Sequence, residues 1–106
     1  MIRATMYWNR LRMEIEGHAG YAEEGKDIVC AGASALVDAL AGALQDAERR
    51  GRTTATAEEK DGKVIIWADP MMGSLNEIKA YFRMCVKGMQ LMHESYRENI
   101  TVKEVL

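Results

Sequence analysis

His18 and Cys30 are the two residues of the chain best suited to nucleophilic chemistry, and they lie close together in the segment from Gly17 to Leu36. A cysteine attacks a carbonyl as its thiolate, so it needs a base to take its proton. A histidine on a folded loop before the cysteine can do this and then return the proton to the leaving group. Spacing and residue type therefore make this segment a candidate site for cysteine-based catalysis.

The cysteine falls at the start of a predicted helix. Asp27 is a favourable N-cap residue, and the helix is expected from Ile28 to about Arg49. In the first helical turn the helix dipole favours negative charge on the sulfur of Cys30. The other interpretation of Cys30, as a buried and inert helix cysteine, stays open on these grounds.

Two further residues of the segment have candidate supporting roles. Asp27 either caps the helix through the Cys30 N–H or orients His18 as the third member of a triad. As a cap it would occupy an amide that could otherwise help to form an oxyanion hole. Ser34 lies one helical turn beyond Cys30 on the same face, where it could bind substrate or orient a neighbour.

Three glycines, Gly17, Gly20 and Gly25, interrupt the stretch before the helix. This stretch has no hydrophobic period, so it is predicted to be a mobile loop over the site. The three glycines do not match either standard phosphate-binding pattern.

A zinc site is the main competing chemistry. Its four potential ligands would be His18, Cys30, Cys85 and His93. The chain contains no C-x-x-C or H-x-x-x-H pair, and Cys85 and His93 are out of phase on a helix. We therefore expect no metal and no other cofactor.

The surrounding elements read as a small α+β fold. Alternating residues predict strands over 2–8 and 11–15. A two-residue turn at Asn9-Arg10 would set Met6 opposite Met13 across this hairpin. Further strands are expected over 52–59, 64–67 and 100–106. Asp61-Gly62 marks a hairpin. A two-residue turn there would place Lys60 opposite Lys63, which is repulsive, so we favour a three-residue loop over 60–62 that places Glu59 opposite Lys63.

A second helix is predicted after Ser74, which forms a capping-box pattern with Glu77. Apolar residues follow it at steps of three and four, and part of this stripe could face a partner subunit. The stripe consists of Leu75, Ile78, Phe82, Cys85, Met89, Met92 and Tyr96. The predicted order is β-β-α-β-β-α-β, a single domain over residues 1–106 with one mixed or antiparallel sheet and two helices.

Composition narrows the functional classes. The chain has 106 residues, a formal net charge of −2 and two cysteines. The charge argues against a direct nucleic-acid partner, and two cysteines make no disulfide framework. No signal peptide is recognisable, and we expect no apolar stretch to approach the about 18 residues that a membrane helix needs. These features predict a cytoplasmic protein with free thiols and no membrane partner.

The run G-H-A-G-Y-A-E-E-G-K-D-I-V-C-A-G-A-S-A resembles the signature of the ribosomal-processing cysteine proteases known as Prp. The resemblance implies a cysteine endopeptidase that removes the N-terminal extension of ribosomal large-subunit protein twenty-seven. It implies a dyad of His18 as base and Cys30 as nucleophile, with a loop that orders over substrate. Asp27 and Ser34 match further signature positions, and the resemblance also implies a homodimer. The alternative is a non-catalytic ribosome-assembly or peptide-binding module that uses the same groove.

Overall fold

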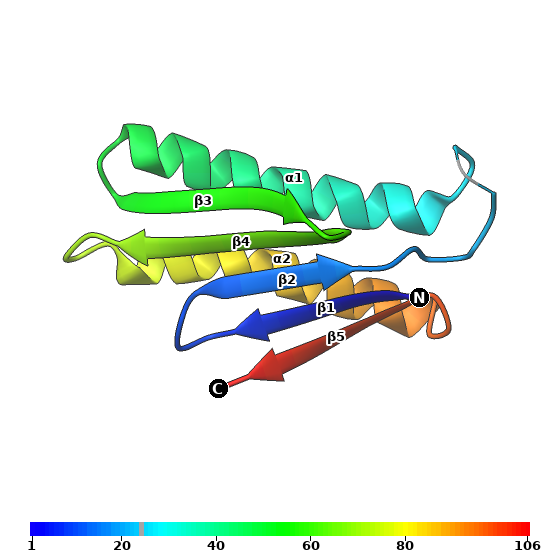
Figure 1. Cartoon of the computed structure of the whole chain (residues 1–106). Helices are drawn as coiled ribbons and strands as arrows, with labels where there is room; N and C mark the ends of the chain where they lie inside the picture. Colours follow the sequence, from blue (N-terminus) through cyan, green and yellow to red (C-terminus); the bar gives the residue numbers. More distant parts are fainter. Residues whose placement is uncertain (24) are drawn as a thin grey trace.

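The secondary structure follows the predicted order in a computed structural model that describes residues 1–23 and 25–106. The elements are β1 (Ile2–Tyr7), β2 (Arg12–Glu16), α1 (Ile28–Arg49), β3 (Thr53–Lys60), β4 (Lys63–Pro70), α2 (Leu75–Ser95) and β5 (Ile100–Val105). The strands form one sheet in the order β3-β4-β2-β1-β5. β1 and β5 run parallel, while the other neighbouring strands run antiparallel. Both helices lie against the same face of this mixed sheet (Figure 1).

The β1–β2 hairpin has the predicted register, with Met6 opposite Met13. Both methionines point into the core and are fully buried. The turn is longer than the predicted two residues, because Leu11 adopts a left-handed conformation with φ 44°. The Leu11 side chain is only 5% exposed, so its burial offsets the backbone strain.

The sheet face without helices is covered by polar and aromatic side chains instead. The guanidinium of Arg12 lies 5.5 Å from the ring centroid of Trp67, and it also pairs with Glu14 at 2.9 Å. Lys63 approaches the other oxygen of Glu14 at 3.2 Å. The hydrogen bond from Arg12 is the main reason that the pKa of Glu14 lies below its usual value, with Lys63 adding to it. This face is held by charge and stacking, and the opposite face by apolar packing.

Both ends of α1 lie where the sequence predicted them. Asp27 is the N-cap, and its side chain accepts from the N–H groups of Val29 and Cys30. Gly51 follows the helix with φ 74°, and the N–H of Arg52 donates to the Ala47 carbonyl at 2.9 Å. This left-handed ending satisfies carbonyls that the helix itself leaves free.

The expectation that no apolar stretch approaches membrane-spanning length was wrong for α1. The helix has 22 residues and a window of mean hydropathy 1.6, which is long and apolar enough to cross a membrane. Asp38 is the only charged residue between Ile28 and Gln45, and alanine and glycine fill much of the rest. Core helices of water-soluble proteins meet the same criterion, and α1 contributes five buried side chains to this core.

The start of α2 differs from the predicted capping box. Ser74 is the N-cap residue, but its side chain makes no capping hydrogen bond. Glu77 accepts instead from Arg50 at 2.6 Å and also binds Tyr81. A charge-assisted hydrogen bond to a guanidinium is stronger than one to a backbone amide, which explains why Glu77 binds Arg50 rather than the backbone N–H of Ser74.

The apolar stripe of α2 is used mainly within the chain. Four of its residues are buried: Ile78, Phe82, Cys85 and Met89. Met92 and Tyr96 are partly buried against the core, while Leu75 is exposed. The stripe therefore gives little support to a subunit interface.

The β3–β4 hairpin corrects the predicted register. Lys60 lies opposite Lys63, and Glu59 lies opposite Val64 rather than Lys63. Asp61 and Gly62 both have positive φ, at 55° and 76°, as a two-residue type I′ turn requires. The fit of this turn to the strand twist outweighs the repulsion of two lysines, one of which is neutralised by Glu14.

Candidate active site

Cys30 lies in the first turn of α1 and is partly exposed, with a free thiol. The backbone N–H of Ala19 donates a hydrogen bond to its Sγ at 3.3 Å. Cys30 thus lies at the N-terminal end of the helix dipole, with an N–H donor on its sulfur. The residue therefore has the exposure and the surroundings that a nucleophilic thiol needs.

Each carboxylate oxygen of Asp27 accepts hydrogen bonds from two backbone N–H groups, an arrangement that we call the Asp27 clamp. Its Oδ1 accepts from the N–H groups of Val29 and Cys30 at 3.0 and 2.9 Å. Its Oδ2 accepts from the N–H groups of Tyr21 and Ala22 at 3.0 and 3.4 Å. The N–H of Cys30 contributes most to lowering the pKa of the Asp27 carboxyl. The carboxylate thus caps the helix and ties the preceding loop to it.

This arrangement bears on the two roles considered for Asp27. Its oxygens bind backbone amides, and no hydrogen bond joins them to the His18 ring among residues 1–23 and 25–106. The N–H of Cys30 is also occupied by this carboxylate. An oxyanion hole at this site has to draw on other donors.

His18 directly precedes the residue that contacts the thiol. Its side chain is exposed, whereas Ala19 is only 2% exposed. In the described part of the chain no hydrogen bond joins the His18 ring to Cys30. The backbone therefore brings His18 next to the site, where it is an exposed residue.

Asn99 is a site residue that the sequence reasoning missed. Its Nδ2 donates to the Ala19 carbonyl at 2.9 Å, from the connection between α2 and β5. The ring of Tyr96 in the same connection meets the ring of Tyr21 edge-on, with centroids 5.3 Å apart. Asn99 is far from Ala19 in the sequence, so no local pattern could have indicated the contact. Figure 1 shows the β2–α1 loop and this connection at the same end of the molecule.

The glycines of the loop have specific backbone roles. Gly17 has φ 92°, and a Cβ there would lie 2.3 Å from the Met1 carbonyl oxygen. Gly20 and Gly25 also have positive φ, but a Cβ on either meets no atom within 4 Å. The predicted mobility of the loop stays a prediction, and it extends over Glu24, which lies outside the described residues.

The other candidate residues lie apart from this arrangement. Ser34 is exposed one turn beyond Cys30 on α1. Cys85 is 3% exposed, and burial raises the pKa of its thiol to about 11. His93 Nδ1 lies 2.7 Å from the Ile100 carbonyl oxygen. Within residues 1–23 and 25–106 no three metal-binding side chains come together.

A family model described as cysteine protease Prp matches residues 1–101. The chain belongs to the cysteine protease Prp family. No curated protein sequence matches the chain as a relative. The family match over residues 1–101 confirms the resemblance found in the run from Gly17 to Ala35.

Several solved structures share the fold of this chain. The essential ribosomal processing protease Prp from S. aureus, with a covalently linked product peptide, has a TM-score of 0.80 at 24% identity. That match covers 99% of this chain and 100% of the other. The protein SMU.848 from Streptococcus mutans has a TM-score of 0.68 at 26% identity, covering 99% and 94%. The α+β fold with its mixed sheet is thus the one found in these proteins.

Membership of the Prp family makes this chain a cysteine protease, which requires one reactive thiol. The two thiols of the chain differ sharply in exposure and surroundings. Cys85 is enclosed in the core, and its neighbours within hydrogen-bond reach are Leu36 O and Met13 Sδ. Cys30 is partly exposed beside a backbone N–H at a helix N-terminus.

Proposed function

We propose that this protein removes the N-terminal extension of ribosomal large-subunit protein twenty-seven, with Cys30 as nucleophile and His18 as base. The observation that carries the proposal is the Ala19 N–H directed at the partly exposed Cys30 sulfur. Two S. aureus structures of the same fold support the substrate class. They hold a ribosomal processing protease with a covalently linked product peptide and with a substrate peptide.

The reaction begins when His18 takes the thiol proton of Cys30. The thiolate adds to the scissile carbonyl, and the tetrahedral adduct collapses as the amide C–N bond breaks. His18 then gives its proton to the departing amine, leaving an acyl group on Cys30 as a thioester. Water adds to the thioester, and its cleavage releases the new carboxylate and the free thiol.

Because no hydrogen bond joins the His18 ring to Cys30 among the described residues, this mechanism requires the imidazole to come within reach of the thiol when the peptide binds. Substrate binding commonly completes a catalytic arrangement in this way. The glycines at positions 17, 20 and 25 give the loop the backbone freedom for such a change.

A homodimer and a cytoplasmic location belong to the same proposal. Two exposed apolar residues of α2, Met84 at 76% and Leu91 at 53%, lie seven positions apart and so share a helix face. This outer face is a more suitable interface than the apolar stripe, which the core already uses. A reducing compartment suits a protein whose two cysteines are both free.

The direct test is cleavage of the full-length precursor of ribosomal protein twenty-seven, followed by mass spectrometry of the products. We expect one cut that releases the short N-terminal extension. Cutting at many sites, or none, would contradict the assigned substrate even if a shorter model peptide were hydrolysed.

A further inference from the structure

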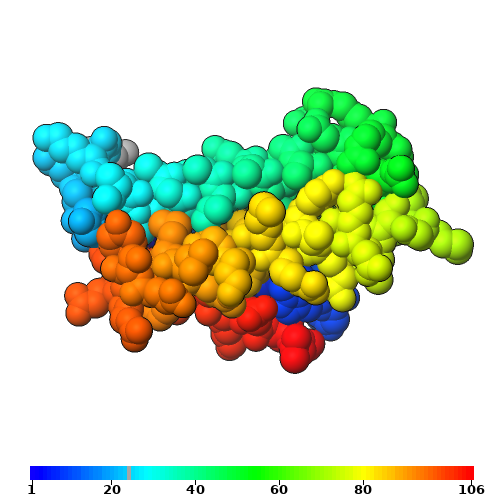
Figure 2. Space-filling model, turned by 180° about the vertical axis from the view of Figure 1, so that it is seen from behind, coloured from blue at the N-terminus to red at the C-terminus, as the bar shows by residue number. Residues whose placement is uncertain are grey.

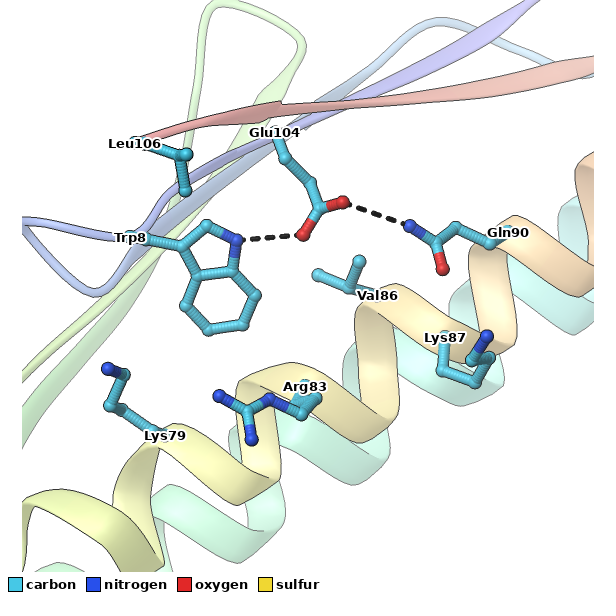
Figure 3. A pocket seen from close by; sticks show the side chains of 8 residues that line it. All are labelled: Trp8, Lys79, Arg83, Val86, Lys87, Gln90, Glu104 and Leu106. Carbon is cyan, nitrogen blue, oxygen red and sulfur yellow. Dashed lines mark hydrogen bonds between the residues drawn. The ribbon is translucent and has the colours of Figure 1, made fainter.

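A cleft separate from the Cys30 site lies between α2 and the ends of β1 and β5. It has a volume of about 380 Å³ and is lined by Trp8, Lys79, Arg83, Lys87, Gln90 and Glu104, among others. Figure 3 shows Trp8 reaching toward α2, with Lys79 and Arg83 beyond its ring. In Figure 2 the first hairpin, in blue, and the C-terminal strand, in red, emerge below the yellow part of α2. The start of α1, where Cys30 lies, is at the other end of the molecule (Figure 1).

Three cations line one wall of this cleft. Lys79, Arg83 and Lys87 follow one another at intervals of four residues, so they form a row along α2 with about 6 Å of helix rise between neighbours. In the part of the chain that the structure describes, none of the three makes a salt bridge. Other cations are paired, among them Arg12 with Glu14 and Arg50 with Glu77. The row is therefore available to an anion.

The opposite side of the cleft offers an aromatic ring and a fixed carboxylate. Trp8 Nε1 donates to Glu104 Oε1 at 2.8 Å, and Gln90 Nε2 donates to Glu104 Oε2 at 3.1 Å. These bonds hold Glu104 in place, and each carboxylate oxygen can accept a second hydrogen bond. The guanidinium of Arg83 lies 5.9 Å from the Trp8 ring centroid. The ring is partly exposed.

We propose that this cleft binds single-stranded nucleic acid, with phosphates on the Lys79–Arg83–Lys87 row and a base at Trp8. Cations that follow a backbone beside an aromatic stacking surface are the features of such sites. Glu104 can accept from the amino or imino groups of a base. A peptide of acidic residues alone could use the cations, but its side chains offer no ring to stack on Trp8 and no donor for Glu104.

The proposal departs from the expectation that the net charge of −2 excludes a nucleic-acid partner. A net charge describes the whole surface, whereas binding depends on the local arrangement of charges. The proposed binding of nucleic acid does not depend on the proposed protease function, because none of the cleft residues belongs to the Cys30 site.

The test is the binding of a fluorescein-labelled uridine dodecamer to the full chain over a range of salt concentrations. Three single-strand phosphate contacts predict a slope of about −2 for log K against log salt. The variant with Lys79→Gln, Arg83→Gln and Lys87→Gln is expected to bind at least tenfold more weakly and to lose most of this slope. A control with Arg3→Gln, Arg52→Gln and Lys60→Gln removes the same charge outside the cleft and should bind as the wild type does.

Tryptophan fluorescence tests the second half of the proposal. In a Trp67→Phe background, the dodecamer should quench the remaining emission from Trp8, and Trp8→Ala should weaken binding about tenfold. The deoxyuridine dodecamer is expected to bind through the same contacts. Equal weakening by the two triple variants, no binding at low salt, or tighter binding of polyglutamate than of either dodecamer would overturn the proposal.

Discussion

At the scale of single residues, the two thiols show how position determines reactivity. Cys30 is partly exposed at a helix N-terminus, with the Ala19 N–H on its sulfur. Cys85 lies in the core, where burial raises the pKa of its thiol to about 11. The sequence could identify Cys30 because a good N-cap residue, Asp27, precedes it by three positions. It could not identify the Ala19 contact, which depends on how the loop folds back.

Asn99 is predicted to be a positioning residue for this site. Its bond to the Ala19 carbonyl holds the peptide whose N–H reaches the Cys30 sulfur. We expect Asn99→Ala to lower kcat about tenfold, since one lost hydrogen bond is worth about that factor, with KM little changed. The check is steady-state kinetics on a substrate peptide together with the melting temperature.

The matched control for this prediction is Asn76→Ala, which removes an exposed asparagine in the first turn of α2. Its kcat should equal that of the wild type. An unchanged kcat in Asn99→Ala would remove the positioning role, as would faster hydrogen exchange spread over the whole fold rather than confined to the Ala19 amide.

At the scale of elements, period and capping signals predicted most of the fold, and turns were the weakest part. The β1–β2 register follows from matching apolar faces, which leaves a single pairing with Met6 opposite Met13. The β3–β4 register could not be decided by charge, because turn geometry outweighed the repulsion between Lys60 and Lys63. The predicted capping box at Ser74 does not form, because Glu77 binds the guanidinium of Arg50, which is distant in the sequence.

Gly17 offers a test of the path from β2 into the loop. Alanine there meets both a left-handed backbone and the Met1 carbonyl oxygen 2.3 Å from its Cβ. We expect Gly17→Ala to lower the free energy of unfolding by at least about 2 kcal/mol. Gly20→Ala, with φ 68° and no atom near its Cβ, should cost about 1 kcal/mol from strain alone. Equal losses in urea unfolding would show that the loop takes another path.

The Asp27 clamp predicts a dependence of stability on pH. Backbone N–H bonds, the largest from Cys30, lower the pKa of Asp27 in the folded chain. Its stabilisation is therefore complete above the unfolded pKa of about 3.9 and is lost as the pH falls through the folded value. The difference in melting temperature between wild type and Asp27→Asn should be largest at neutral pH and shrink below about pH 4. Other acidic groups are common to both proteins, so a difference independent of pH would contradict the clamp.

At the scale of the whole molecule, the sequence predicted the architecture but not the distribution of surface charge. One sheet with two helices followed from the order of periodic segments. The row of cations beside Trp8 could not be predicted in this way, because it forms only where β1, α2 and β5 come together. The length of α1 was predicted correctly, but the hydropathy of its alanine-rich sequence was underestimated.

Assembly is a prediction at this scale. If the outer face of α2 forms the homodimer, the mass in solution at micromolar concentration should be twice that of the 11.9 kDa chain. Changing Met84 and Leu91 to glutamate should then give a monomer with an unchanged fold, since both side chains are exposed. A monomeric wild type would remove the dimer, and a dimeric double variant would move the interface elsewhere.

Of the two thiols, we expect Cys30, and not Cys85, to break the peptide bond. The most direct measurement is hydrolysis of a peptide that spans the extension junction by wild type, Cys30→Ser and Cys85→Ser, with intact-mass analysis of the protein during turnover. We predict an acylated wild type, turnover close to wild type in Cys85→Ser, and a loss of at least a thousandfold in Cys30→Ser. Full hydrolysis by Cys30→Ser, or an acyl group carried on Cys85, would contradict the account.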